Sequence, residues 1–184
     1  MIRAPDRWMV LIAGPMRSGK STFAHHVVGQ FGGVRVSFGG AIRRRALALG
    51  RTAGRTSLQQ VGEQWVANDP AGLCDDVMAP VAGRPQVVVD GVRHMHVYNL
   101  LKARAKNRRV MLVFVDTDPD IRRVRLRADE ADDATVNAIM AHSTESELPF
   151  LRDVADLVID GAGNAAWALS ALAAMLGPLR GSEK

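Results

Sequence analysis

The sequence of 184 residues predicts a three-layer α/β/α fold with a five-stranded parallel sheet, and two observations predict it. First, short runs of Val, Ile and Leu alternate along the chain with stretches of helical pattern, as in successive β-α-β units. Second, these runs are apolar at nearly every position, which indicates strands covered by helices on both faces and therefore parallel pairing with right-handed crossovers. Sheets of this kind bind ligands at the carboxyl ends of their strands.

Five segments carry the strand pattern, and glycine, proline or capping residues mark the ends of three expected helices. The expected strands are residues 8–13, 34–36, 86–89, 110–115 and 157–159. The first helix is expected at 22–28, ending at Gly29 or Gly32. Asp118 before Pro119 predicts an N-cap with a first-turn proline, and Asn164 predicts the cap of a last helix that ends before Gly177.

The composition fits one compact enzyme domain, because 47% of the residues are hydrophobic. No apolar run approaches the roughly 20 residues of a membrane span, and no signal-peptide pattern is present, so we expect a cytoplasmic protein with no membrane partner. A single cysteine, Cys74, excludes an internal disulfide and is expected in the core. The net charge of +5 admits nucleic acid, but no basic run is interleaved with aromatic residues, so polyphosphate ligands explain it better. The oligomeric state stays open, a homodimer included.

Residues 14–21 match the phosphate-binding pattern G-x-x-x-x-G-K-[ST] at every fixed position, between an expected strand and an expected helix. Glycines let backbone N–H groups turn towards phosphates, and the helix N-terminus adds partial positive charge. Lys20 is therefore expected to reach the β- and γ-phosphates of ATP, and Ser21 to ligate Mg²⁺. The expected ATP-binding residues are Gly14, Pro15, Met16, Arg17, Ser18, Gly19, Lys20, Ser21 and Thr22.

Asp90 follows the apolar run 87–89 and precedes Gly91, so a strand delivers it to the edge where the phosphate loop lies. We interpret Asp90 as a catalytic residue that organises Mg²⁺ through a water molecule. The alternative is an ordinary aspartate-glycine turn, which would carry no chemistry.

Residues 90–93, Asp-Gly-Val-Arg, resemble the aspartate-glycine-x-x-arginine segment of nucleoside monophosphate kinases of the adenylate kinase type. Residues 37–43 are similar to the segment that opens the monophosphate-binding helix of that family, although Phe38 and Gly40 replace a small polar residue and an aspartate. The resemblance implies that Arg43 and Arg93 grip the phosphate of the acceptor nucleotide. The implied acceptor-binding residues are Ser37, Phe38, Gly39, Arg43 and Arg93.

The stretch 115–127 resembles the strand and arginine-rich helix that lead into the lid of these kinases, which implies catalytic roles for Arg123 near the donor base and Arg127 on the donor phosphates. A spacing of four places these two on one helix face and Arg125 elsewhere. Residues 155–160 look like the last strand of small phage and bacterial deoxynucleoside monophosphate kinases. The implied organisation is a single P-loop kinase domain with a helical acceptor-binding insert at about 38–80, a short lid at about 122–147 and a frayed tail at 178–184.

Planar guanidinium groups hold phosphate oxygens bidentately, so arginines suit a site where two anions meet, although each could instead lie on a solvated helix face. The acidic run 128–133 is interpreted as a solvated helix start without a ligand role. Residues 53–65 are expected to form part of the base pocket, and the spacing of their apolar residues predicts an amphipathic helix. His94 and His96 are interpreted as bystanders, because a metal site needs more ligands, and Glu147 as part of a helix terminus.

Kinases that phosphorylate an alcohol usually need a carboxylate that accepts the hydroxyl proton, whereas a phosphate acceptor is already ionised. The place after the second strand holds Ser37, Phe38 and Gly39, which favours a phosphate acceptor unless Asp69, Asp75 or Asp76 enters the site. We therefore expect Mg²⁺-dependent transfer from ATP to a nucleoside or deoxynucleoside monophosphate. The alternatives are a kinase for dephospho-coenzyme A, a small metabolite or a modified DNA base, a non-catalytic ATP-gated regulator, and a nucleic-acid-binding module.

Overall fold

A computed structural model of the chain describes residues 7–129, 132–141 and 146–177. It contains one sheet of five strands in the order β2-β3-β1-β4-β5, and every neighbouring pair is parallel. The strands are β1 (Trp8–Ala13), β2 (Val34–Ser37), β3 (Gln86–Val92), β4 (Arg109–Asp116) and β5 (Leu157–Asp160). Each expected strand is thus confirmed, with ends that extend by up to three residues. The expected frayed tail lies outside the described residues.

Helices cover both faces of the sheet and also extend beyond its carboxyl edge. The helices are α1 (Lys20–Phe31), α2 (Phe38–Ala48), α3 (Arg55–Asn68), α4 (Pro70–Met78), α5 (Met95–Arg104), α6 (Pro119–Arg127), α7 (Asp133–Met140), α8 (Leu148–Asp153) and α9 (Ala165–Leu176), with a 3₁₀ turn η1 (Ala79–Val81). Helices and sheet form the three-layer α/β/α fold that the sequence predicts. In the part of the chain that the structure describes, no helix is long and apolar enough to cross a bilayer.

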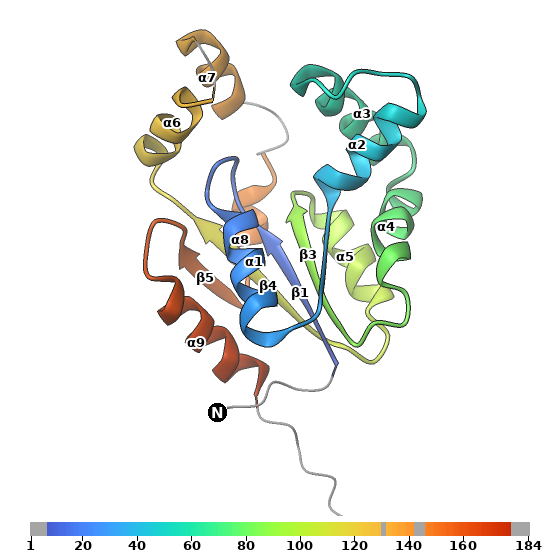
Figure 1. Ribbon diagram of the computed structural model, residues 1–184, viewed down its shortest axis with the longest axis vertical. Coiled ribbons are helices and arrows are strands. Elements are labelled where there is room, and N and C mark those ends of the chain that lie inside the picture. The colour runs from blue at the N-terminus through green and yellow to red at the C-terminus, as the bar shows by residue number, and fades with distance from the viewer. Residues whose placement is uncertain (1–6, 130–131, 142–145, 178–184) are drawn as a thin grey trace, which may run out of the picture.

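The fully buried central strand β1 shows how the two cores are built. Met9 and Leu11 point into a core formed with α2, α4, α5 and α8, whereas Val10 and Ile12 point into a core formed with α1 and α9. Because successive side chains of a strand point to opposite faces, an apolar residue at every position supplies both cores. Figure 1 shows the sheet between these layers.

The helix ends agree with the cap residues read from the sequence. The side chain of Asp118 accepts a hydrogen bond from the N–H of Asp120, and Asn164 accepts from two N–H groups of the first turn of α9. Helix α1 runs through Gly29 and ends at Gly32, whose φ of 78° suits glycine. Cys74 is buried in the core, where desolvation raises its pKa to about 11.

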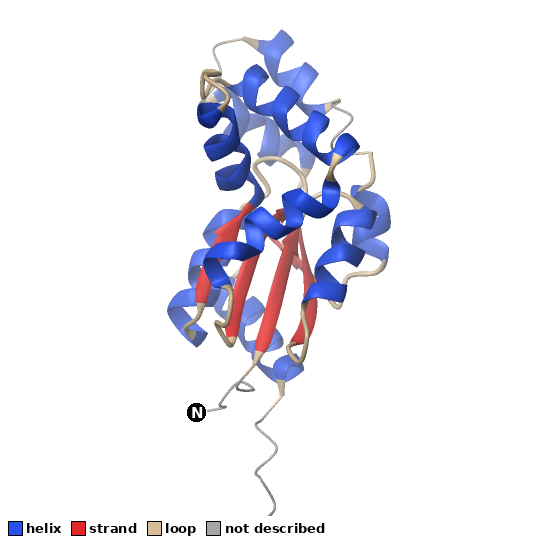
Figure 2. Cartoon of the chain, turned by 90° about the vertical axis from the view of Figure 1, so that its right-hand side faces the viewer, coloured by secondary structure: helices blue, strands red, loops and turns tan. Residues whose placement is uncertain are grey.

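Two pairs of helices lie beyond the carboxyl ends of the strands. In Figure 1, α2 and α3 lie above β3 on one side, and α6 and α7 lie above β5 on the other. Figure 2 shows both groups from the side, above the edge of the sheet. The expected insert at about 38–80 contains α2, α3, α4 and most of η1, and the expected lid at about 122–147 contains most of α6, all of α7 and some residues outside the described ones. Both divisions remain predictions.

The cap of the last helix can be tested by mutation. N164A removes the acceptor for the first N–H groups of α9, and such caps are worth about 0.5–2 kcal/mol. We expect the free energy of unfolding in urea to fall by about 1 kcal/mol, because α9 packs directly on α1 and β5. S170A, an exposed change in the same helix, is the control and should stay within about 0.5 kcal/mol of the unchanged protein.

Candidate functional site

The phosphate loop between β1 and α1 has the geometry that its glycines predict. Gly14 and Gly19 have φ angles of 139° and 97°, and Arg17 has a φ of 61°. A Cβ atom on Gly14 would lie 2.2 Å from the carbonyl oxygen of Val115, so only glycine fits there. Lys20 is the first residue of α1, is 8% exposed, and donates from Nζ to the carbonyl oxygen of Pro15 at 2.5 Å. The loop and the N-terminus of α1 thus form the arrangement typical of phosphate binding.

Three side chains from outside the phosphate loop donate hydrogen bonds to its carbonyl oxygens. Thr117 Oγ1 donates to the carbonyl of Ser18 at 2.8 Å. From α6, Arg122 Nε donates to the carbonyl of Met16 at 2.9 Å, and Arg125 Nη1 donates to that of Arg17 at 3.1 Å. Because these side chains bond the carbonyl oxygens on the outer side of the loop, the N–H groups on its inner side can donate to a bound anion.

The arginines of α6 that contact the phosphate loop are therefore not the two that the sequence singled out. Arg123 donates to Asn137 at 2.7 Å, and Arg127 donates to Asp133 at 2.7 Å, so both face α7. Neither lines the cavity beside the loop, and the roles expected for them stay predictions. The spacing of three between Arg122 and Arg125 also places two side chains on one helix face, which the sequence reasoning did not weigh.

Ser21 and Asp90 are brought together as the sequence predicts. Ser21 Oγ donates to Asp90 Oδ2 at 2.8 Å, and Asp90 is 3% exposed. The pairing of β3 with β1 explains this contact, since Asp90 lies opposite Ile12, two residues before the loop begins. A hydroxyl and a carboxylate oxygen beside a phosphate loop are hard ligands that suit Mg²⁺, so the donor set fits the expected ion.

Arg35 is a site residue that the sequence reasoning missed. It lies within β2, and its Nη2 donates to Asp90 Oδ2 at 2.5 Å, while Nη1 lies 3.3 Å from His25 Nε2. Its side chain is 27% exposed and lines the same cavity as Asp90. A single charged residue in an otherwise apolar strand was the signal that could have revealed it.

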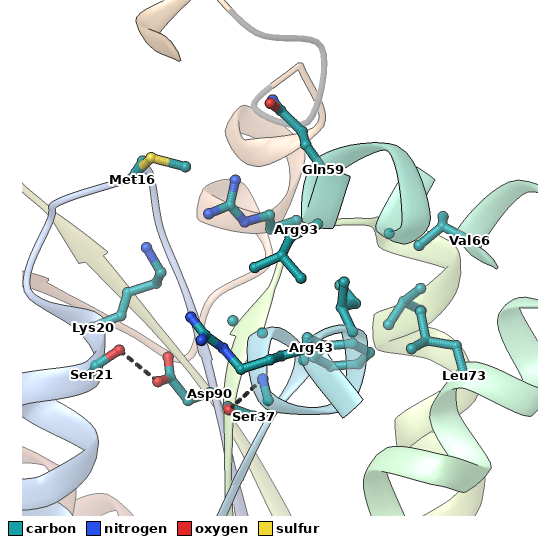
Figure 3. A pocket seen from close by; sticks show the side chains of 18 of the residues that line it. Met16, Lys20, Ser21, Ser37, Arg43, Gln59, Val66, Leu73, Asp90 and Arg93 are labelled. Carbon is teal, nitrogen blue, oxygen red and sulfur yellow. Dashed lines mark hydrogen bonds between the residues drawn. The ribbon is translucent and has the colours of Figure 1, made fainter. Parts of the chain in front are cut away.

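A cavity of 660 Å³ extends from the phosphate loop to the helices on the acceptor side. Figure 3 shows Lys20 and Ser21 on one side of it, and Arg43, Arg93 and Gln59 on the other. Of the expected ATP-binding residues, the cavity is lined by Met16, Arg17, Lys20 and Ser21, while Gly14, Pro15, Ser18, Gly19 and Thr22 do not line it. The cavity is thus the space in front of the phosphate loop.

All five residues expected to bind the acceptor line this cavity, although two have structural roles as well. Ser37 Oγ accepts from the N–H of Gly40 at 3.1 Å and so caps α2. Phe38 is 6% exposed and packs in the core, so its main contacts are with other apolar side chains. Gly39, Arg43 and Arg93 complete the set, and Arg43 and Arg93 point towards Lys20 in Figure 3.

The three aspartates that could have supplied a base do not line the cavity. Asp69 caps α4 by accepting from the N–H of Gly72 at 2.8 Å. Asp75 pairs with Arg104, whose hydrogen bond lowers the pKa of the carboxyl, and Asp76 pairs with Arg44. Among the described residues, the carboxylates that line the cavity are those of Asp90 and Glu63.

His94 and His96, expected as bystanders, lie beside Glu147. His94 Nδ1 is 2.8 Å from Glu147 Oε1, and the N–H of Met95 donates to Glu147 Oε2 at 2.8 Å. Burial opposes ionisation of Glu147, but these hydrogen bonds and the two histidines outweigh it, so its pKa is lowered. No local pattern relates these residues, because Glu147 is 53 positions from His94.

Comparison with known proteins supports the fold. Neither the comparison with protein-family models nor that with curated proteins gives a match. Among solved structures, the shikimate kinase of Bacteroides thetaiotaomicron aligns with a TM-score of 0.56 at 18% identity, covering 92% of this chain and 95% of that one. The shikimate kinase of Aquifex aeolicus aligns with a TM-score of 0.57 at 15% identity, over 91% and 95% of the two chains.

A third similar structure, a gluconokinase from Sinorhizobium meliloti, aligns with a TM-score of 0.53 at 14% identity, over 94% of this chain and 93% of that one. At this level of identity the likeness concerns the fold, which is that of shikimate-kinase-like P-loop proteins. Activity and acceptor have to be argued from this chain's own residues.

The contacts of α6 predict which arginines support nucleotide binding. We expect R122Q and R125Q to raise the Kd for ATP roughly tenfold or more, because each loses a charged donor to a loop carbonyl, worth about 1.5–3 kcal/mol. Isothermal titration calorimetry on samples with an unchanged circular dichroism spectrum measures this. R123Q and R127Q are the controls, and a larger loss of affinity in them would favour the original assignment of donor contacts to Arg123 and Arg127.

Proposed function

We propose that this chain transfers the γ-phosphoryl group of ATP to a nucleoside or deoxynucleoside monophosphate, giving ADP and the diphosphate. The observation that carries the proposal is the charge of the cavity in front of the phosphate loop. Six basic residues line it, against the two carboxylates of Asp90 and Glu63. The basic residues are Arg17, Lys20, Arg35, Arg43, Arg55 and Arg93.

This charge balance favours an acceptor that carries a phosphate. A phosphate monoester has about −1.5 to −2 charges at neutral pH, whereas a carboxylate acceptor has one. Arg35 and Asp90 form an ion pair with each other, which leaves five basic residues of the lining against the carboxylate of Glu63. The remaining excess of guanidinium groups suits a dianion better than a monoanion, since planar guanidinium groups bind phosphate oxygens in pairs.

The far wall of the cavity suits a nucleobase. Apolar residues from α2, α3, α4 and α5 line it: Ile42, Leu58, Val66, Leu73 and Val97. Polar groups on the same wall come from Gln59 and Glu63, one turn apart on α3. A mostly apolar wall with a few polar groups is typical of small-molecule sites and can hold a nucleobase, and 660 Å³ lies within the usual range of about 300–1,000 Å³.

The mechanism requires positioning more than proton transfer. The acceptor phosphate is already ionised, so its oxygen can attack without a base. Arg43 and Arg93 would hold that phosphate in line with the γ-phosphate, which Lys20 and the loop N–H groups would hold from the other side. Ser21 and Asp90 would hold Mg²⁺, which neutralises charge on the transferred phosphate when bound.

Glu63 supports a second candidate function. The similar structures include enzymes named for shikimate and gluconate, whose acceptor groups are alcohols. An alcohol acceptor would need a proton acceptor, and Glu63 is the cavity carboxylate that is not part of the pair with Ser21. E63Q should leave transfer to a monophosphate at a similar kcat, whereas it should abolish transfer to an alcohol.

The proposal is tested by an ADP-release assay with Mg-ATP and a panel of acceptors. The panel contains all ribonucleoside and deoxyribonucleoside monophosphates, dephospho-coenzyme A, shikimate and gluconate. We expect turnover on one or a few monophosphates, and K20A should lower kcat by about 10²–10³-fold because a donor to the transferred phosphate is lost. Turnover confined to shikimate, gluconate or dephospho-coenzyme A would contradict the proposal. ATP binding without any turnover would favour the regulator instead.

The arginines on the acceptor side give a more specific prediction. R43A and R93A should raise the KM for the acceptor about tenfold or more and change the KM for ATP little, because both side chains line the acceptor side of the cavity. R44A is a matched control, since Arg44 is the neighbour of Arg43, pairs with Asp76 and lies outside the cavity. Equal effects of R43A and R44A would argue against a role for Arg43 in binding the phosphate.

A further inference from the structure

A group of metal-ligating side chains lies outside the phosphate site. One ring nitrogen each of His94 and His96 and one carboxylate oxygen of Glu147 lie within 4.8 Å of one another. His94 is the N-cap of α5 and His96 lies in the first turn of that helix, while Glu147 directly precedes α8. Together with Glu63 and Pro70 they line a second hollow, which adjoins the acceptor cavity through residues common to both, such as His94 and Glu63.

The carboxylate of this group is held in place by the backbone. Glu147 Oε2 accepts from the N–H of Met95, which is the first residue of α5, and Oε1 lies 2.8 Å from His94 Nδ1. His94 is 20% exposed, so its ring is largely packed. A ligand carboxylate that is fixed by a backbone N–H resembles the outer-shell support that orients metal ligands in known sites.

We propose that His94, His96 and Glu147 bind one divalent transition ion of the zinc type. Two imidazole nitrogens and one carboxylate oxygen form a donor set that such ions prefer, with a fourth position open to the hollow. Bonds of about 2.0–2.1 Å place tetrahedral ligands about 3.3 Å apart, whereas the atoms of this group lie up to 4.8 Å apart and His94 Nδ1 lies 2.8 Å from Glu147 Oε1. His96 is exposed, so rotation of its side chain can bring its ring closer. The hydrogen bond between His94 and Glu147 has to lengthen as both groups turn towards the ion.

This site is chemically distinct from the Ser21–Asp90 pair. That pair offers oxygen ligands, which suit Mg²⁺, whereas imidazole nitrogen selects transition ions over Mg²⁺. The single thiol of the chain does not compete, because Cys74 is buried and its pKa of about 11 keeps it protonated.

An ion at this place would act on the acceptor side of the cavity. It would join the β3–α5 junction to the segment that enters α8, two parts of the chain that Glu147 already connects by hydrogen bonds. Arg93 is the residue next to His94, so the ion would also restrict the backbone that carries Arg93. The inferred role is structural, and the proposal does not depend on the identity of the acceptor.

Calorimetric titration with Zn²⁺ tests the site, using the full chain without an affinity tag, free of nucleotide and in millimolar Mg²⁺. We expect one Zn²⁺ per chain, and a Kd at least about tenfold higher in both H96Q and E147Q, since each loses a direct ligand. Gln at position 147 retains an oxygen for the Met95 N–H, so the cap of α5 is preserved. H26Q, which changes an exposed histidine of α1, is the matched control and should bind as the unchanged chain does.

Any of the following outcomes would overturn the proposal. Absence of saturable Zn²⁺ binding would show that the cluster is only a helix cap. Equal affinity in H96Q, E147Q and the unchanged chain would place the ion elsewhere, as would a loss in H26Q of the same size. A loss in only one of the two ligand variants would exclude the three-ligand site, and displacement by Mg²⁺ would exclude transition-ion selectivity.

Discussion

The site depends on one constraint, which is that the phosphate loop must turn its N–H groups inward while its carbonyl oxygens are satisfied from outside. A residue with positive φ such as Arg17 costs about 1–3 kcal/mol where it is not glycine, so the loop holds this shape only if neighbours determine it. Thr117, Arg122 and Arg125 supply the donors. Lys20 bonds the carbonyl of Pro15 from within the loop. The loop is therefore shaped by β4 and α6 as much as by its own glycines.

This dependence joins the phosphate loop to the helices beyond the sheet. Helix α6 supports the loop with one face and packs on α7 with another, where Arg123 and Arg127 find their partners. Arg17 also forms an ion pair with Asp129, just after α6. A movement of α6 and α7 would change the support of the loop carbonyls, which gives a physical route by which closure and phosphate binding could be coupled.

Local patterns predicted the parts of the fold and site that local chemistry determines. Continuous apolar runs located the strands, and the expected caps were correct because a side chain and its N–H partners are neighbours in sequence. Contacts between distant segments were predicted only where a motif pointed to them, as for Ser21 and Asp90, and others were missed. Arg35 reaches Asp90 across 55 positions, and Glu147 reaches His94 across 53. On α6 the sequence offered several arginines, and only the packing of the helix shows that Arg122 faces the loop.

The charge of the cavity, and not the fold, carries the argument about the acceptor, because one fold can host many different functions. Here Arg35 of β2 lines the cavity and donates to Asp90, while Asp69 serves as a helix cap and Asp75 and Asp76 pair with arginines. A cavity built in this way attracts anions, and of the two carboxylates that line it among the described residues, Asp90 is hydrogen-bonded to Ser21 and Arg35, whereas Glu63 lies on α3. Both properties suit an acceptor that is already ionised. The positive charge offsets the repulsion between the anionic acceptor and ATP, and no base is needed because the attacking oxygen carries no proton.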